Sequence, residues 1–159
     1  MIELPRPLAA ALLQHADEAA PEEACGFVVL LGQRVVRIER TRNASATPTV
    51  HFTFDQRGYQ RIVQVEKEER ERAGRDVDIG IYHSHPASPA RPSATDVREM
   101  RQAWPDALQL LLGFGEDPAA GRVIRAYRID WGGAVTPQPL HLTDGPADAS
   151  GDAPAGGDC

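Results

Sequence analysis

The segment IGIYHSHPASPARPSATD, residues 79–96, decides the fold because it predicts a buried strand, a turn and a helix start in succession. Its first residues belong to VDIGIYHSH, which predicts a strand over residues 77–85. Pro86 follows directly and is expected to end that strand. The pattern Ser-x-x-Asp at Ser93 and Asp96 then predicts a helix that begins just after the serine.

Two histidines end this strand with their side chains on one face. His83 and His85 are two residues apart, and residues i and i+2 of a strand point the same way. Two imidazoles with a common direction can bind one zinc ion through nitrogen atoms at roughly 2.0–2.1 Å. A pair of surface histidines at a strand end is the alternative interpretation. The metal interpretation therefore depends on further ligands nearby.

The helix start beyond the turn offers such a ligand. If the loop folds the helix start back over the strand end, Asp96 can supply a carboxylate oxygen as the third ligand. Three protein ligands leave one tetrahedral position for water, which is the pattern of catalytic zinc. The Ser93 hydroxyl would lie beside the metal and could stabilise the oxyanion of a tetrahedral intermediate. Helix capping alone is the alternative role for both residues, and the two roles are compatible.

A general base that is not a metal ligand would complete a hydrolytic site. Glu22 and Glu23 stand immediately before an apolar run, where a carboxylate is partly desolvated and holds a proton more tightly. The alternative is a solvated pair of acids that ends the first helix. Spacing alone does not choose between the two glutamates. Cys25 follows on the same predicted face as Glu23, either as a thiol near the site or as a small core residue.

Three helices are predicted from apolar periodicity and end signals, over residues 5–20, 55–73 and 94–104. Gly74 is expected to cap the second helix, and the charged run at its end is expected to be a solvated face. The inner face of that helix is predicted from four residues: Tyr59, Ile62, Val63 and Val65.

The strand predictions alternate with these helices. Besides the central strand, apolar runs predict strands over residues 25–31, 34–40, 50–54, 107–115, 122–130 and 134–142. This order indicates an α/β fold with a mixed, largely antiparallel sheet flanked by helices.

Composition narrows the function classes. The chain has 159 residues, enough for one domain, with a net charge of −6. An acidic chain without a basic patch disfavours nucleic acid and anionic membrane surfaces as partners. The apolar runs are far shorter than the ~20 residues of a membrane span, and the N-terminus lacks the basic region of a signal peptide. With two cysteines and no disulfide pattern, a cytoplasmic location is expected.

Composition also changes near the C-terminus. Residues 1–142 carry all the apolar patterning and are predicted to form the folded domain. Residues 143–159 are small and acidic and contain no large apolar side chain, so a disordered acidic tail is predicted there.

The motif residues resemble the signature of the JAMM, or MPN-plus, zinc metalloproteases. That signature is His-x-His-Pro, six residues, Ser, two residues, Asp, and residues 83–96 match it at every position. The family also has an upstream Glu-x-x-Gly at the start of a buried strand, which residues 23–26, EACG, match. The resemblance extends over about residues 5–142 and is to the short, stand-alone prokaryotic members.

The resemblance implies a fold, a site and a substrate class. The fold would be the JAMM/MPN fold, a curved mixed sheet with flanking helices and a cytidine-deaminase-like core. His83, His85 and Asp96 would hold one zinc ion per chain, Glu23 would be the base and Ser93 would polarise the intermediate. The reaction would be Glu-assisted attack of a zinc-bound water on the peptide or isopeptide bond after the C-terminal Gly-Gly of a ubiquitin-like protein. In prokaryotes that partner would be of the sulfur-carrier type.

Two other functions compete with this one. The first is a zinc-dependent amidohydrolase of a small molecule. Its deaminase version is disfavoured because the chain has no Cys-x-x-Cys element. The second is a non-catalytic MPN scaffold, although the intact motif favours an enzyme. A substrate groove beside the metal is expected along residues 49–54 and the SPARP loop, with His51 in a structural or surface role. The oligomeric state, the exact bond and the choice of zinc over another divalent metal stay open.

Overall fold

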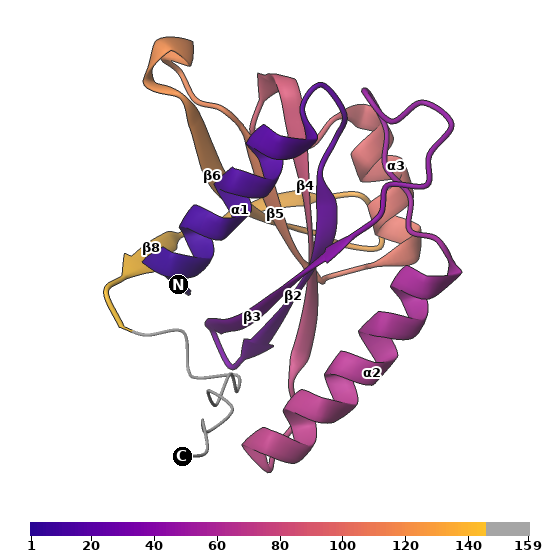
Figure 1. The fold of residues 1–159 in the computed structure, drawn as a ribbon, viewed down its shortest axis with the longest axis vertical. Coiled ribbons are helices and arrows are strands. Elements are labelled where there is room, and N and C mark those ends of the chain that lie inside the picture. Colours follow the sequence, from indigo (N-terminus) through magenta and orange to yellow (C-terminus); the bar gives the residue numbers. More distant parts are fainter. Residues whose placement is uncertain (146–159) are drawn as a thin grey trace, which may run out of the picture.

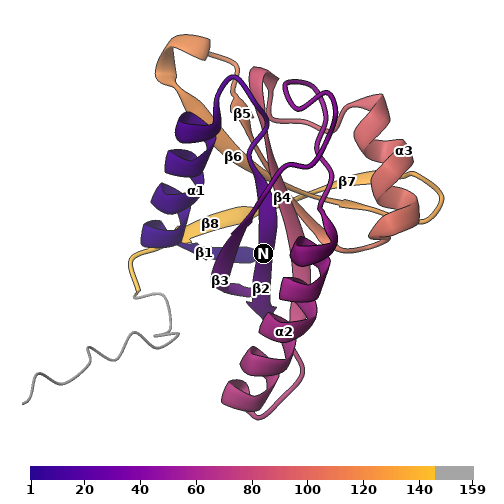
Figure 2. The same cartoon turned by 45° about the vertical axis from the view of Figure 1, so that its right-hand side comes forward.

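A curled mixed sheet separates one helix from the other two in the computed structural model, which describes residues 1–145. Helix α1 crosses one face of the sheet, whereas α2 and α3 lie on the opposite side (Figures 1 and 2). The elements in chain order are β1 (Ile2–Pro5), α1 (Arg6–Ala19), β2 (Cys25–Leu31), β3 (Arg34–Thr41), α2 (Gln56–Ala73), β4 (Asp78–Pro89), α3 (Ala94–Ala103), β5 (Leu108–Phe114), the 3-10 turn η1 (Pro118–Ala120), β6 (Arg122–Ile129), β7 (Val135–Gln138) and β8 (Leu140–Thr143).

The strand order confirms a mixed α/β fold. Within residues 1–145 the sheet has eight strands in the order β7-β6-β5-β4-β2-β3-β1-β8. Strand β4 is central, antiparallel to β2 and parallel to β5. Strands β7 and β8 lie at opposite ends of this order although Pro139 alone separates them in the chain. The sheet therefore has to curl until its two ends approach each other.

Two apolar layers hold the helices to the sheet. On one side α1 buries Leu12 and Ala16 against alternate residues of β5, including Leu108 and Leu110. On the other side a second core cluster joins α2 and α3 to β2 and β4. Strand β2 contributes to both layers because its successive side chains point to opposite faces. These layers fix the central strands whose ends carry the polar motif.

Two strand predictions near the N-terminal half were wrong. Strand β1 was missed because Pro5 and Pro7 indicated only a helix start, whereas Ile2–Pro5 pairs with β8 and β3. The predicted strand over residues 50–54 is a loop. Phe52 and Phe54 alternate as they would in a strand, and both are buried in the second core cluster, but the segment is not paired with any strand within residues 1–145.

Two strand boundaries also differ from the predictions. Residues 134–142 form two strands instead of one, because the chain leaves β6 after Gln138 and crosses to β1. Pro86 does not end β4, which continues to Pro89 and pairs there with Phe114. The predicted acidic tail starts in the last residue of β8, Thr143, and residues 146–159 lie outside the described part of the chain.

The buried face of α2 differs from its apolar pattern. Ile62 and Val65 are buried as predicted, but Tyr59 is 48% exposed and Val63 69% exposed. Glu69 takes a buried place instead, with its carboxylate 2.9 Å from Arg37 of β3. The charged run is therefore partly an ion-pair contact with the sheet. Asp55 and Gly74 cap the two ends of this helix, which confirms the predicted C-cap.

Candidate functional site

Three of the predicted site residues converge on one point beside the middle of β4. The Nε2 atoms of His83 and His85 are 3.1 Å apart. The Asp96 Oδ2 atom lies 3.3 Å from the first nitrogen and 3.0 Å from the second. All three residues are buried, and His83 is only 1% exposed. Burying these polar side chains costs more free energy than burying apolar ones would, so packing alone does not explain the cluster.

The central position of β4 holds the first histidine in place. His83 lies between Cys25 of β2 and Leu111 of β5 in the sheet register. Its ring stacks on Phe52, with 4.4 Å between centroids. The loop that was predicted as a strand therefore forms one wall of the site.

The helix start brings the carboxylate to the histidines. Ser93 is the N-cap of α3, and its Oγ accepts a hydrogen bond from the Asp96 backbone N–H at 3.0 Å. The Asp96 Oδ2 atom accepts one in return from the Ser93 backbone N–H at 2.9 Å. The capping box and the cluster thus use the same carboxylate oxygen. Capping holds Asp96 against the histidines, so it is compatible with the ligand role predicted for this residue.

The donor set fits a small cation. The His85 Nδ1 atom lies 2.9 Å from the Pro89 carbonyl oxygen and therefore carries a proton, so the neutral ring has its lone pair on Nε2. Without a cation, the contact between Nε2 and the Asp96 oxygen needs a proton on Nε2, and a bound metal ion can take the place of that proton. A tetrahedral zinc with bonds of about 2.0–2.1 Å separates its ligand atoms by roughly 3.3 Å. The observed separations of 3.0–3.3 Å match that value.

Glu23 also lies close to the two histidines. Its carboxylate and the nitrogens of His83 and His85 all lie within 4.8 Å of one another. Glu23 is 5% exposed, whereas the neighbouring Glu22 is exposed, so the structure distinguishes the two glutamates that spacing alone could not. The cluster thus contains two carboxyl groups, and their different environments distinguish their proton affinities.

Those environments shift the two carboxyl groups in opposite directions. Burial raises the pKa of Glu23 to about 7, and nearby His85 opposes this rise. Burial also opposes the charge on Asp96, but hydrogen bonds from His83 and His85 outweigh it and hold the pKa of that carboxyl well below its usual range. At neutral pH Asp96 is an anion, whereas Glu23 can both accept and release a proton.

The two imidazoles differ in the same way. Burial lowers the pKa of His83 despite the adjacent Asp96 carboxylate. Burial has the same sense at His85, but the hydrogen bonds to Asp96 and the Pro89 carbonyl prevail and raise the pKa of His85. A neutral His83 offers a lone pair, as a metal ligand must.

Two residues that position Glu23 were missed in the sequence. Ser84 is fully buried, and its Oγ accepts a hydrogen bond from the Ala24 backbone N–H at 2.7 Å. The Asn43 side-chain amide donates to the carbonyls of Glu23 and His51 at 3.1 and 3.0 Å. Ser84 stands between the two histidines, a signal that was available. Asn43 lies in a polar loop whose composition gave no such signal.

Two other candidates have structural contacts. The Cys25 thiol is buried and faces Thr41, and burial raises the pKa of that thiol to about 11. This fits the core interpretation, since the thiolate is the reactive form. The His51 ring lies between the Ser45 hydroxyl and the Glu99 carboxylate, 2.8 and 2.9 Å from them.

A hollow of about 420 Å³ lies behind the Phe52 wall. It is lined by His51–Phe54, by the C-terminal half of α3, including Met100, and by Trp104 directly after that helix. Residues of the segment predicted to line a substrate groove thus line a hollow, but none of Glu23, His83, His85 and Asp96 does, and the groove beside the metal stays a prediction. The SPARP loop does not line this hollow.

The chain resembles known proteins over most of its length. Residues 5–130 match the family of prokaryotic homologues of the JAB domain. A protein named CysO-cysteine peptidase from Mycobacterium tuberculosis is 36% identical over 141 residues, 84% of this chain and 86% of that protein. A desampylase from Haloferax volcanii is 38% identical over 108 residues, 63% of this chain and 71% of that protein.

Solved structures share the fold. A JAB1/MPN domain protein from Archaeoglobus fulgidus superposes with a TM-score of 0.52 at 14% identity, covering 90% of this chain and 97% of that one. This likeness confirms the predicted JAMM/MPN architecture. None of the helices within residues 1–145 is long and apolar enough to cross a membrane.

Proposed function

Because the chain belongs to the prokaryotic JAB family, we propose that it is a zinc-dependent metallopeptidase acting on a ubiquitin-like protein. The bond is the peptide or isopeptide bond after the C-terminal Gly-Gly of a carrier of the sulfur-carrier type. The relatives named CysO-cysteine peptidase and desampylase support hydrolysis on such a protein. We assign the activity to residues 1–142.

One observation carries the proposal. His83, His85 and Asp96 present three ligand atoms within 3.0–3.3 Å of each other, and a second carboxylate of raised pKa lies beside them. A purely structural cluster of this burial needs no second carboxylate with a pKa near neutrality. A hydrolytic site needs both a ligand set and a proton acceptor.

The ligand set is His83, His85 and Asp96. When bound, zinc supplies a Lewis acid that polarises the amide carbonyl and makes water acidic near neutral pH. Asp96 suits the ligand role better than Glu23 because it stays ionised and contacts both Nε2 atoms. The Pro89 carbonyl and the capping box orient His85 and Asp96 from behind.

Glu23 performs the proton transfers. As a carboxylate it accepts a proton from the water that attacks the carbonyl carbon, and as an acid it returns that proton to the departing amine. A pKa near 7 suits both halves of this cycle at neutral pH. The Ser93 hydroxyl, at the helix start beside Asp96, is assigned to the oxygen on which negative charge develops.

Cleavage of a defined carrier tests the proposal. A ubiquitin-like sulfur carrier with an extension after Gly-Gly is incubated with as-purified, chelated and zinc-restored protein, and mass spectrometry identifies the new end. We expect cleavage after the second glycine that chelation abolishes and zinc restores. A short Gly-Gly amide cleaved as fast as the whole carrier would indicate a small-molecule amidase. Protein that holds one zinc per chain and cleaves neither would contradict the proposal.

A further inference from the structure

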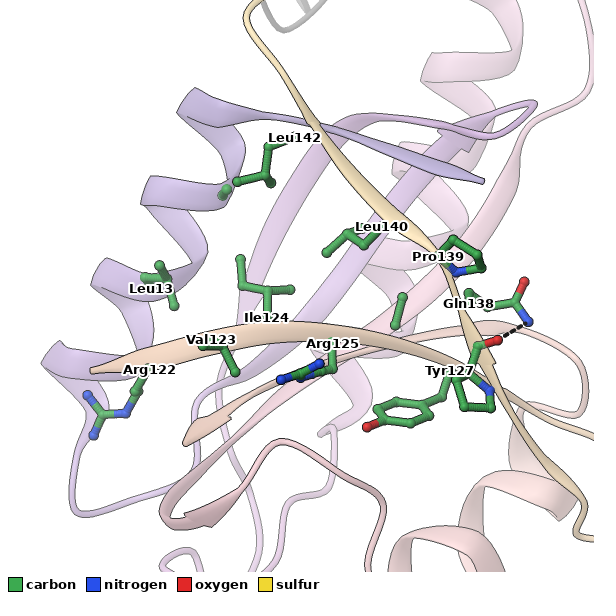
Figure 3. A pocket seen from close by; sticks show the side chains of 13 residues that line it. Leu13, Arg122, Val123, Ile124, Arg125, Tyr127, Gln138, Pro139, Leu140 and Leu142 are labelled. Atoms are coloured by element: carbon green, nitrogen blue, oxygen red, sulfur yellow. Dashed lines mark hydrogen bonds between the residues drawn. The ribbon is translucent and has the colours of Figure 1, made fainter. Parts of the chain in front are cut away.

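A second hollow lies on the α1 side of the sheet, away from the polar cluster. Its volume is about 720 Å³, within the range of roughly 300–1,000 Å³ that is typical of binding pockets. Figure 3 shows its two long walls, β6 and β8, which diverge from Tyr127 and Gln138 toward α1. Leu13 of α1 closes the wide end of this wedge.

The wedge forms because β8 does not continue the pairing of β7 with β6. Strand β7 pairs with Ala126–Ile129 of β6, and the chain then crosses at Pro139 to pair with β1. Within residues 1–145, the edge of Arg122–Arg125 facing away from β5 thus has no strand partner. The edge of β8 facing away from β1 is open in the same way. Unpaired backbone donors and acceptors at such edges can pair with an added strand.

The side chains around these edges are mostly apolar, and one arginine among them, Arg125, can pair with an added carboxylate. Leu13, Ile124, Leu140 and Leu142 line the wedge, and Leu142 is 37% exposed. Arg122 is held by an ion pair with Asp17 and lies over the Phe114 ring. Arg125 is exposed, lines the wedge and has no ion pair within residues 1–145.

We propose that the wedge between β6 and β8 binds an extended segment of a partner protein by strand addition to the β6 edge at Arg122–Arg125. Backbone pairing requires an extended chain, which excludes a helix as the occupant. Apolar side chains of the segment contact Leu13, Leu140 and Leu142, and a carboxylate on its outer face pairs with Arg125. The occupant is therefore a strand in which apolar and acidic residues alternate. Arg125 lies on β6, so pairing with this cation favours the β6 edge over the edge of β8, which is also open.

A labelled hexapeptide of alternating Val and Asp, blocked at both ends, is the probe. It is titrated into the full chain by fluorescence anisotropy, with chelator present, so the result does not depend on the proposed hydrolysis. We expect saturable binding that Arg125→Glu weakens roughly fivefold. The same variant should strengthen binding of the matched Val and Lys peptide. Arg75→Glu, the same charge change at an exposed residue outside the wedge, should leave both affinities unchanged.

Hydrogen exchange locates the peptide. The Val and Asp peptide should slow exchange of the backbone amides of residues 122–125, and Leu142→Ser should reduce this protection if Arg125→Glu fails to fold. Absence of saturable binding, equal effects of the two charge reversals, or protection confined to another region would overturn the proposal. Protection without peptide would overturn it too. If independent of concentration, it would identify residues 146–159 as the occupant; if it rose with concentration, it would identify a second copy of the chain.

Discussion

At the scale of single residues, the site depends on two carboxylates in different environments. Asp96 is tied to two imidazoles and a backbone N–H, whereas Glu23 is buried without a comparable set of donors. The same functional group is thereby kept ionised in one place and near its titration midpoint in the other. This difference supports separate roles as ligand and proton carrier, and the next two predictions separate them.

Glu23→Gln removes the titrating group and keeps its shape. We expect the variant to fold and to bind zinc as the natural chain does, with turnover reduced by roughly 10²–10⁴-fold, the usual contribution of general acid–base catalysis. Zinc content by elemental analysis and carrier cleavage by mass spectrometry check the two halves. Cleavage at the natural rate would remove Glu23 from the mechanism.

Asp96→Asn is the matched change at the other carboxylate. The amide cannot supply an anionic ligand, so zinc affinity should fall along with turnover, and His83→Ala should behave likewise. Competition with a chromogenic chelator measures the affinity. If Asp96→Asn kept its zinc while Glu23→Gln lost it, the two assignments would have to be exchanged.

A third prediction concerns His15, whose Nδ1 lies 2.7 Å from the buried Tyr82 hydroxyl. Burial, aided by Arg40, lowers the pKa of His15 to about 4. The unfolded chain binds this proton below about pH 6.5, so stability is full above that pH and is lost as pH falls toward 4. We expect roughly 1 kcal/mol less stability at pH 5 than at pH 7 from this group, after allowance for solvent screening.

Urea unfolding at the two pH values measures that loss. His15→Gln should remove about the stated part of the pH dependence, because glutamine does not titrate in this range. An unchanged difference between pH 5 and pH 7 in the variant would show that other groups cause it.

At the scale of elements, the glycine of EACG is explained by close packing at the start of β2. A Cβ atom on Gly26 would lie 2.1 Å from the Glu39 carbonyl oxygen and 2.5 Å from the Tyr82 ring. Both obstacles belong to neighbouring strands of the sheet, so neither can move without disturbing the segment that carries Glu23. The absence of a side chain at Gly26 thus allows β3 and β4 to pack closely against β2. This packing explains why a glycine follows Glu23 at this position of the motif.

Gly26→Ala should therefore destabilise the chain by roughly 1–3 kcal/mol, the usual cost of overpacking. Denaturant unfolding measures the change. Gly132→Ala is the control, because its added Cβ would meet only the flexible Asp130 side chain, at 3.3 Å. Equal stabilities of the two variants would contradict the packing explanation.

The elements also show what the sequence could reveal. Periodicity and end signals located α1, α2, α3 and the strands β2 to β6, because local propensity and long-range packing agree there. The segment 50–54 and the strand β1 were misassigned, since pairing partners rather than local pattern decide whether an extended run becomes a strand. Glu69 was placed on a solvated face because its partner Arg37 lies in another element.

At the scale of the whole molecule, the fold assembles a site from residues 23 to 96 at one end of the sheet. The motif spacing predicted which polar residues would meet, and the structure brings His83, His85 and Asp96 into contact. The supporting contacts of Asn43 and Phe52 were not predictable, because they depend on how the 42–53 loop folds against β4 and the start of β2. The separation of β7 and β8 at Pro139 was also not predictable from the sequence, since it arises only when the sheet curls.

The most direct test of the central claim is anomalous diffraction at the zinc absorption edge from crystals of zinc-loaded protein. The account predicts one peak per chain, about 2.0–2.2 Å from the Nε2 atoms of His83 and His85 and from an Asp96 carboxylate oxygen. The Glu23 carboxylate should lie outside bonding distance of the metal. A peak bound to Glu23 instead of Asp96, or no peak at this cluster, would contradict the account.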